Sequence, residues 1–203
     1  MNAFIRQFGR PSGRMGKLFG RMMAVSNKKM HKAVLPQIKG CGCLLEIGFG
    51  SGAQLEIIHK AQPKTRLYGI DISDKMLEMA RKKLGENAQL SLCDCAKTPF
   101  ENSCFDAVIS TDCCYFWHDA EKVLREIKRI TKPSGKLVLA YNQMYAKSVH
   151  KADNSLGMYC DENIINSCAA VGLKLISNKK CGRRQRVLTF VSESVPTDNG
   201  EKK

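Results

Sequence analysis

The stretch LLEIGFGSG, residues 44–52, joins an apolar run to a turn that has glycines at positions 48, 50 and 52. A short apolar run bounded by turn residues is typical of a buried strand, which we predict over residues 43–47. Glycine adopts left-handed backbone conformations at little steric cost and lets a ligand come close to the main chain. The stretch therefore predicts a buried strand that leads directly into a ligand-binding turn.

Strands and helices alternate along the rest of the chain. Ser73 is a typical helix N-cap residue, and the KPSG stretch at residues 132–135 has the composition that ends a helix. The apolar periodicity predicts further strands over 66–70, 90–93, 105–110, 136–141, 173–177 and 186–191. It predicts helices over 27–38, 52–60, the segment from Ser73 through Leu84, 119–130 and 161–170.

This alternation predicts an α/β fold in which helices cover both faces of a parallel sheet. Ligands of such sheets bind beyond the carboxyl ends of the strands, at the switch point beside the first strand. The glycine turn follows the first strand, so we expect the binding site there.

The composition is that of a single globular domain. The chain has 203 residues, of which 43% are hydrophobic. It contains no apolar run of about 18 residues, the length that spans a bilayer, and no signal-peptide core. Its ten cysteines form no CxxC pair, which favours reduced thiols in a cytoplasmic protein over a disulfide framework or a zinc site.

The net charge of +14 is concentrated at the two ends of the chain. Residues 1–45 contain nine lysines and arginines and no acid, and residues 163–192 contain six and again no acid. Such ends suit an anionic substrate, RNA or an anionic membrane surface, or form a solvated basic face. We expect a basic N-terminal cap segment over 1–40, a binding domain over 41–192 and a disordered tail over 193–203. An Arg-rich, acid-free start is also typical of an organelle transit peptide.

Acidic residues mark three strand ends. Glu46 precedes the glycines, Asp71 ends the second predicted strand, and Asp94 follows the third. A carboxylate at the second strand end can accept hydrogen bonds from both hydroxyls of a ribose, and one at the third strand end can accept a hydrogen bond from the adenine amine. Three carboxylates suit a cationic nucleoside–amino-acid cofactor, whereas they would repel a pyrophosphate.

The chain resembles a known family in five stretches that occur in the family's order. They are LLEIGFGSG, YGIDISDKMLEMARKKL, LCDCAKTPF, FDAVISTDCCYFWHD and VLREIKRITKPSGKLVL, and they cover roughly residues 42–141, with a weaker likeness through 191. The family is the class I S-adenosylmethionine-dependent methyltransferases, in particular the ubiquinone/menaquinone-biosynthesis C-methyltransferases. The resemblance implies a Rossmann-like, doubly wound sheet of seven strands, mostly parallel with an antiparallel last strand. It also implies S-adenosyl-L-methionine as cofactor, S-adenosyl-L-homocysteine as product and a small-molecule methyl acceptor.

The resemblance also implies roles for individual residues. The loop around the methionine part of the cofactor would consist of Glu46, Ile47, Gly48, Phe49, Gly50 and Gly52. Asp71 would bind the ribose, and Ile72 would pack on the adenine. Asp94 and the Cys95 amide would bind the adenine edge, and Thr111 would line the sulfonium region. The family usually has alanine where this chain has Cys95. Each acid also has a structural interpretation: Glu46 as a cap for local amides, Asp71 as a helix-entry residue and Asp94 as a solvated loop residue.

The stretch TDCCYFWHD, residues 111–119, follows the fourth strand, where substrate and methyl donor should meet. Tyr115 can line a substrate pocket or pack the next helix onto the sheet. His118 can abstract a proton near neutral pH, or serve in the cap of the following helix. The cysteine pair at 113 and 114 can hold a soft metal or fill the core as small thiols. We favour the second interpretation and expect that no metal is required.

Two other functions compete with methyl transfer. The pattern Gly48-x-Gly50-x-x-Ala53 also fits the fingerprint of an NAD-dependent oxidoreductase, although Asp94 and the closing pair of strands argue against it. The basic ends suit a nonenzymatic protein that binds RNA or a partner on the same fold. The chain lacks the Asn/Asp-Pro-Pro-aromatic and Pro-Cys motifs of nucleic-acid methyltransferases, which makes a nucleic-acid substrate the less favoured prediction.

Overall fold

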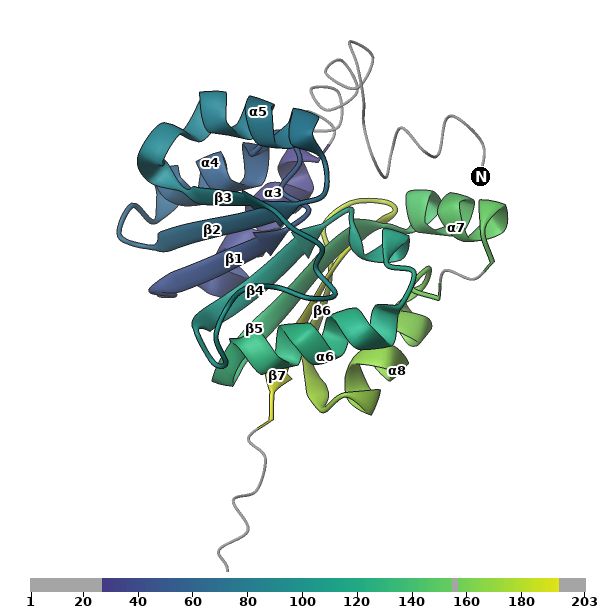
Figure 1. Cartoon of the computed structure of the whole chain (residues 1–203). Helices are drawn as coiled ribbons and strands as arrows, with labels where there is room; N and C mark the ends of the chain where they lie inside the picture. The colour runs from purple at the N-terminus through teal and green to yellow at the C-terminus, as the bar shows by residue number, and fades with distance from the viewer. Residues whose placement is uncertain (1–26, 155–156, 194–203) are drawn as a thin grey trace, which may run out of the picture.

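The computed structural model describes residues 27–154 and 157–193, which form a seven-stranded sheet between two layers of helices (Figure 1). The strands are β1 Cys43–Ile47, β2 Arg66–Asp71, β3 Gln89–Leu92, β4 Phe105–Thr111, β5 Thr131–Asn142, β6 Leu173–Lys180 and β7 Gln185–Ser192. The α-helices are α3 Lys28–Val34, α4 Ala53–Ala61, α5 Asp74–Leu84, α6 Ala120–Ile130, α7 Gln143–Ala152 and α8 Asp161–Ala170, and short 3-10 helices are η1 Leu35–Ile38, η2 Gly85–Asn87 and η3 Cys114–Phe116.

The sheet has the strand order β3-β2-β1-β4-β5-β7-β6. The strands from β1 to β5 pair in parallel, and β7 pairs antiparallel with both β5 and β6. The predicted α/β sheet with an antiparallel last strand is therefore confirmed. Because β1 lies between β2 and β4, the strand order reverses at β1, and the carboxyl ends of β1 and β4 border the crevice where ligands of such sheets bind.

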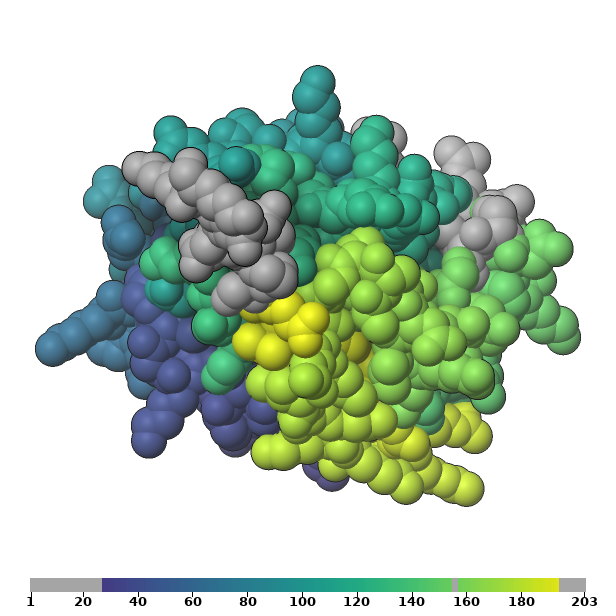
Figure 2. Space-filling model, turned by 90° about the horizontal axis from the view of Figure 1, so that it is seen from below, coloured from purple at the N-terminus to yellow at the C-terminus, as the bar shows by residue number. Residues whose placement is uncertain are grey.

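Each strand of the sheet centre is apolar on both faces, as a buried parallel sheet requires. Alternate residues of β1 enter different clusters: Leu44 packs with α3, α4 and α5, and Leu45 packs with α6 and α8. The two helix layers are visible on opposite sides of the sheet in Figure 1. Seen from below in Figure 2, the segment from α8 to β7 forms a large part of the surface beside the purple α3 region.

Local signals placed most helix ends correctly. Ser73 accepts a hydrogen bond from the backbone amide of Met76 at 3.4 Å, and Asp119 accepts one from Lys122 at 2.9 Å. The KPSG stretch ends α6 as predicted. The chain then enters β5 at Thr131, earlier than expected, because Thr131 already pairs with Phe105; the register shifts there, and regular pairing resumes between Ala107 and Lys136.

Two helical segments differ from the prediction. The helix expected over 27–38 divides at Pro36 into α3 and the 3-10 helix η1, because proline has no backbone donor to continue an α-helix. The helix α7 was not predicted, because its sequence QMYAKSVHKA shows no wide apolar stripe. Asn142 begins α7 by accepting a hydrogen bond from the amide of Met144 at 3.0 Å.

The ends of the chain are only partly described. Residues 27–38 pack onto the sheet, with Met30, Val34 and Ile38 fully buried. Residues 1–26 of the predicted cap segment and 194–203 of the predicted tail lie outside the described residues. In the part of the chain that the structure describes, no helix has both the length and the apolar character needed to cross a membrane.

The helix α6 provides a test of the core. Ile127 is fully buried, whereas Arg125 is exposed and pairs with Glu121 one turn away. We expect Ile127→Ala to lower the free energy of unfolding by about 2–5 kcal/mol, since it removes buried methyl groups and leaves a cavity. Urea unfolding measures this loss. The control Arg125→Ala should cost less than about 0.5 kcal/mol, and equal losses in the two variants would contradict the assigned core face.

Candidate functional site

A cavity of about 460 Å³ lies at the carboxyl ends of β1, β2 and β4 and extends to the loop after β3. It coincides with the point where the strand order reverses, the position predicted from the alternation of strands and helices. Its volume falls within the range of small-molecule sites, about 300–1,000 Å³. The glycine turn therefore borders a cavity of the size that small-molecule ligands occupy.

The glycine turn closes one side of this cavity. Gly48, Gly50 and Gly52 all have positive φ angles, of 73°, 52° and 76°. Residues other than glycine seldom adopt such angles. A Cβ atom at Gly48 would lie 2.5 Å from Cys113 Sγ, and one at Gly52 would lie 3.0 Å from Leu84 Cδ1. A Cβ atom at Gly50 would meet nothing within 4 Å. Gly48 and Gly52 are thus needed for packing, whereas Gly50 presents its main chain to open space.

Two carboxylates lie beside the turn. Glu46 is 2% exposed, and its Oε2 atom has no hydrogen-bond partner within the described residues. Burial, and secondarily the charge of Asp71, raises the pKa of Glu46 well above its usual value. Asp71 accepts hydrogen bonds of 2.9 Å from the amides of Gly50 and Ser73, yet burial still raises its pKa. Two anions held close together in this way favour a cationic ligand.

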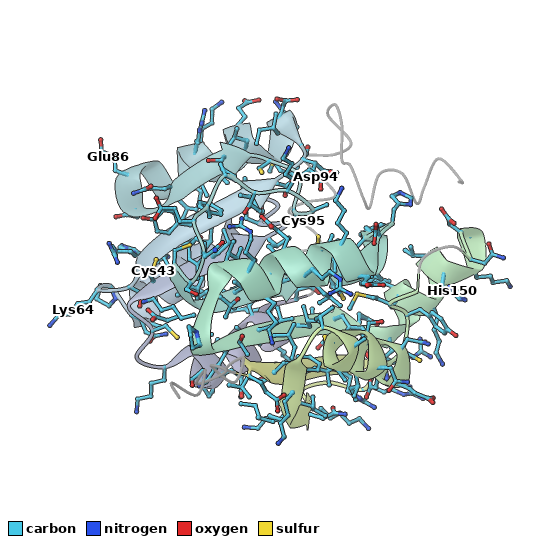
Figure 3. All side chains as sticks on the ribbon, turned by 60° about the horizontal axis from the view of Figure 1, so that its bottom comes forward. Cys43, Lys64, Glu86, Asp94, Cys95 and His150 are labelled. Carbon is cyan, nitrogen blue, oxygen red and sulfur yellow. The ribbon has the colours of Figure 1, made fainter. Side chains whose placement is uncertain are left out.

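The third strand end contributes a more open wall. Asp94 accepts a hydrogen bond of 2.8 Å from the amide of Ala96, which shapes the loop that also contains Cys93 and Cys95. Figure 3 shows Asp94 and Cys95 close together, away from Lys64, which precedes β2. Ile72 is 45% exposed although it is a large apolar residue. An exposed apolar side chain beside a hydrogen-bonding loop suits a flat ring with polar edges.

The fourth strand end forms the remaining wall. Thr111 lines the cavity, and its buried Oγ1 atom has no hydrogen-bond partner within the described residues. Phe116, Trp117 and the exposed His118 follow it around the cavity. Tyr115 does not line the cavity: it is 2% exposed and packs in the core with α6. Of the two interpretations of Tyr115, the structure therefore agrees with the one in which it packs the next helix onto the sheet.

Most residues predicted for the site lie together. The cavity lining includes Glu46, Ile47, Gly48, Phe49, Gly50, Asp71, Ile72, Asp94, Cys95, Thr111 and His118. Gly52 and Tyr115 are absent from it. The lining also includes residues that sequence reasoning missed, among them Asn27, His31, Gln54, Asp112, Cys113 and Lys122.

The residues from α3 and α4 were the hardest to find. His31 and Gln54 are 5% and 2% exposed, and the Nδ1 atom of His31 and the Oε1 atom of Gln54 have no partner within the described residues. Burial, with a smaller effect from Lys83, lowers the pKa of His31 to about 4, so this imidazole is neutral at pH 7. The available signal was the i, i+4 spacing of Asn27 and His31 on the helix face that also carries Met30 and Val34.

Comparison with known proteins agrees with this geometry. A family model described as a methyltransferase domain matches residues 45–139. The ubiquinone/menaquinone biosynthesis C-methyltransferase UbiE of Desulfotalea psychrophila is 32% identical over 111 residues, which are 54% of this chain and 45% of that protein. The uncharacterized methyltransferase YdaC of Bacillus subtilis is 28% identical over 141 residues, 68% of this chain and 78% of that protein. The chain thus spans less than half of the first relative.

The fold also matches solved structures. A chain from the complex between the Haloferax volcanii Trm112 methyltransferase activator and a methyltransferase superposes with a TM-score of 0.80. The match covers 96% of this chain and 99% of that one at 16% sequence identity, a likeness of fold. The matched region contains the glycine turn, the three strand-end acids and the fourth strand. Residues 45–139 therefore form a class I S-adenosylmethionine-dependent methyltransferase domain that resembles those of the ubiquinone/menaquinone-biosynthesis C-methyltransferases.

Proposed function

We propose that this protein transfers a methyl group from S-adenosylmethionine to a small-molecule acceptor bound in the cavity. The observation that carries the proposal is the pair of buried carboxylates, Glu46 and Asp71, beside a glycine turn within a methyltransferase domain. When bound, the cofactor supplies a methyl carbon made electrophilic by the attached sulfonium. The chain itself holds the two reactants in line and excludes water. Holding them in this geometry accelerates the displacement, because the entropy of bringing the reactants together is lost on binding rather than in the reaction step.

The residues present fit this cofactor. Five lining residues carry buried polar atoms that lack partners within the described residues: Glu46, Gln54, His31, Thr111 and Trp117. We assign Glu46 to the ammonium of the methionine part, and Gln54 and His31 to its neighbouring polar groups. A buried polar atom without a partner destabilises a protein by about 1–3 kcal/mol, so a polar ligand that satisfies these atoms gains affinity.

We assign the rest of the cofactor to the other strand ends. Asp71 would bind the ribose hydroxyls through the lone pairs that Gly50 and Ser73 leave free, Ile72 would pack against the adenine, and the loop at Asp94 and Cys95 would bind its polar edge. The proposed sulfonium position lies near Thr111. His118 stays a candidate proton acceptor because it lines the cavity beside the acceptor space.

The competing functions receive less support. Glu46 lies beside the glycine turn, where a dinucleotide-binding fold holds the pyrophosphate, and its charge would repel that group. Several basic residues near the end of the chain, for example Lys179, Lys180 and Arg183, are exposed in the β6–β7 hairpin. Contact with solvent is enough to explain their charge there. We also propose a cytoplasmic location, since all ten cysteines are free thiols and such thiols persist in a reducing compartment.

The Asp71 carboxylate offers the first test. We expect Asp71→Ala to abolish the thermal shift caused by S-adenosylhomocysteine while the protein without ligand remains folded. Asp71→Asn keeps an oxygen for the Gly50 amide but loses the charge, so its dissociation constant should rise about 10- to 100-fold, corresponding to about 1.5–3 kcal/mol for a charged hydrogen bond. Calorimetry measures both. The control Asp74→Asn changes an exposed carboxylate three residues away, and wild-type binding by the Asp71 variants would place the site elsewhere.

The raised pKa of Glu46 offers the second test. A carboxyl whose pKa is raised by burial is protonated at higher pH than usual, and the ligand's ammonium would favour its charged form. We therefore expect binding of S-adenosylhomocysteine to release a proton, and its affinity to fall by at most about tenfold per pH unit as the pH drops below the Glu46 pKa. Calorimetry in two buffers with different ionisation enthalpies counts the proton. Glu46→Gln should bind without this release, and an unchanged proton count in that variant would refute the assignment.

A further inference from the structure

Three elements at the carboxyl edge of the sheet carry exposed lysines and arginines and no acidic residue. They are α3, α7 and the β6–β7 hairpin turn at residues 178–186, and Figure 1 shows this turn between α3 and α7. Together they expose nine cations, which we call the basic edge: Lys28, Lys29 and Lys32 of α3, Lys147 and Lys151 of α7, and Lys179, Lys180, Arg183 and Arg184 of the hairpin.

Contacts between distant segments hold these three elements together. The amide of Gln143, at the start of α7, donates to the carbonyl of Arg184 at 2.8 Å, and Arg184 Nη1 lies 2.8 Å from Met144 Sδ. On the other side of the turn, Cys181 packs against the core cluster that contains Met30 of α3. The cations therefore gather on one edge of the molecule although they come from three distant parts of the chain.

The cations of the basic edge differ from those of other helices because they have no acidic partner. Among the described residues none of the nine forms an ion pair, whereas α4, α5 and α6 each place cations beside glutamates. Lys60, for example, pairs with Glu56 at 2.6 Å. Solvent explains the charge of each exposed cation by itself, but like charges that gather without acids repel one another. Such a surface is stabilised by a partner with many negative charges.

The basic edge lies on one side of the cavity. Asn27, directly before Lys28, lines the cavity. The surface ends on the side of α6 and α8, where the exposed acids Asp119 and Glu162 stand at the helix starts. A partner bound to the basic edge would therefore lie beside the opening of the cavity without covering its α6 wall.

Two features favour a lipid surface over RNA as the negatively charged partner. Single-stranded RNA is bound by stacking its bases on aromatic side chains. Tyr145 is the only tyrosine, phenylalanine or tryptophan of the three elements, and it packs against the core. Met144, by contrast, is 41% exposed beside Arg184. An apolar side chain among cations suits the boundary between lipid headgroups and acyl chains.

The sequence that leads into the basic edge has the same character. Residues 1–26 lie outside the described residues, and their sequence contains five lysines and arginines and no acid. It also contains large apolar residues, among them Phe4, Ile5, Phe8, Leu18 and Phe19. Cations interspersed with large apolar residues are typical of segments that bind anionic membrane surfaces. The sequence thus adds to the charge of the basic edge at the end where α3 begins.

We propose that the basic edge binds the surface of a lipid bilayer that contains anionic lipids. The cations contact the headgroup phosphates, and Met144 lies at the boundary with the acyl chains. Each cation held near an anionic bilayer strengthens binding by about fivefold, so several cations on one edge give a stable attachment. The proposal does not depend on methyl transfer, because it concerns a surface outside the cavity.

Sedimentation of the full chain with lipid vesicles tests this proposal. The probes are vesicles of phosphatidylcholine alone and vesicles of phosphatidylcholine and phosphatidylglycerol in a three-to-one ratio. We expect binding to the second kind only. Raising NaCl from about 0.1 M to about 1 M should release the protein, since the Debye length falls from about 10 Å to about 3 Å. The double variant Arg183→Gln with Arg184→Gln should lower the affinity by about 10- to 30-fold.

A matched control removes the same charge from the opposite edge of the sheet. Lys60 and Lys82, near the ends of α4 and α5, are 70% and 74% exposed. The double variant Lys60→Gln with Lys82→Gln should bind the anionic vesicles within about twofold of wild type, because charges more than a Debye length away from the lipid are screened. Circular dichroism checks that each variant is folded. If the hairpin variant does not fold, Lys147→Gln with Lys151→Gln on α7 provides the second test, with the same expected loss.

Several outcomes would overturn the proposal. They are equal binding to the two kinds of vesicle, binding that does not change with salt, and equal losses in the control and the basic-edge variants. Retention of a single-stranded RNA at a lower phosphate concentration than the vesicles need, with the same variants impairing it, would identify the surface as an RNA site instead. The vesicle assay contains no methyl donor. A failure of the proposed methyltransferase function would therefore leave its result unchanged, and the two proposals are tested separately.

Discussion

Three left-handed glycines bring the end of β1 close to Cys113 on one side and to α5 on the other. A larger residue at Gly48 or Gly52 would be strained, since both have positive φ angles and a Cβ atom there would lie 2.5 Å from Cys113 Sγ or 3.0 Å from Leu84 Cδ1. The amide of Gly50 is tied to Asp71 at 2.9 Å, so the turn also sets the position of the β2 carboxylate. The cavity exists because this turn packs tightly on two sides and stays open at Gly50.

The charge of the cavity lining is opposite in sign to the net charge of the whole chain. The net charge is +14, yet Glu46, Asp71, Asp94 and Asp112 all line the cavity, and Lys122 is its one lysine or arginine among the described residues. Burial raises the pKa values of Glu46, Asp71 and Asp112. Such raised values indicate carboxylates that lack the cation that would stabilise their charge. A positively charged cofactor bound in the cavity would supply that cation and stabilise the charged form of these carboxylates.

The two ends of the cavity differ in what they offer a ligand. The wall from β1 to β3 presents carboxylates, a glycine turn and an exposed Ile72, features suited to a nucleoside with a charged amino-acid part. The wall after β4 presents Phe116 and Trp117 beside Asp112, an aromatic surface with one oriented acceptor. Thr111 lies between the two walls, so the methyl group and its acceptor would meet at the end of β4.

The succession of strands and helices along the chain, the glycine turn and the acids at 46, 71 and 94 could be predicted from the sequence, because apolar runs and turn residues are local signals. Parallel strands then bring their carboxyl ends to one edge of the sheet. The helix α7 and the lining residues His31, Gln54 and Asp112 could not be predicted. Asn27 meets Asp112 across 85 positions, and Tyr115 packs in the core while Phe116 and Trp117 line the cavity. Only tertiary packing decides such contacts, since which face of a helix or turn meets the cavity depends on elements distant in the chain.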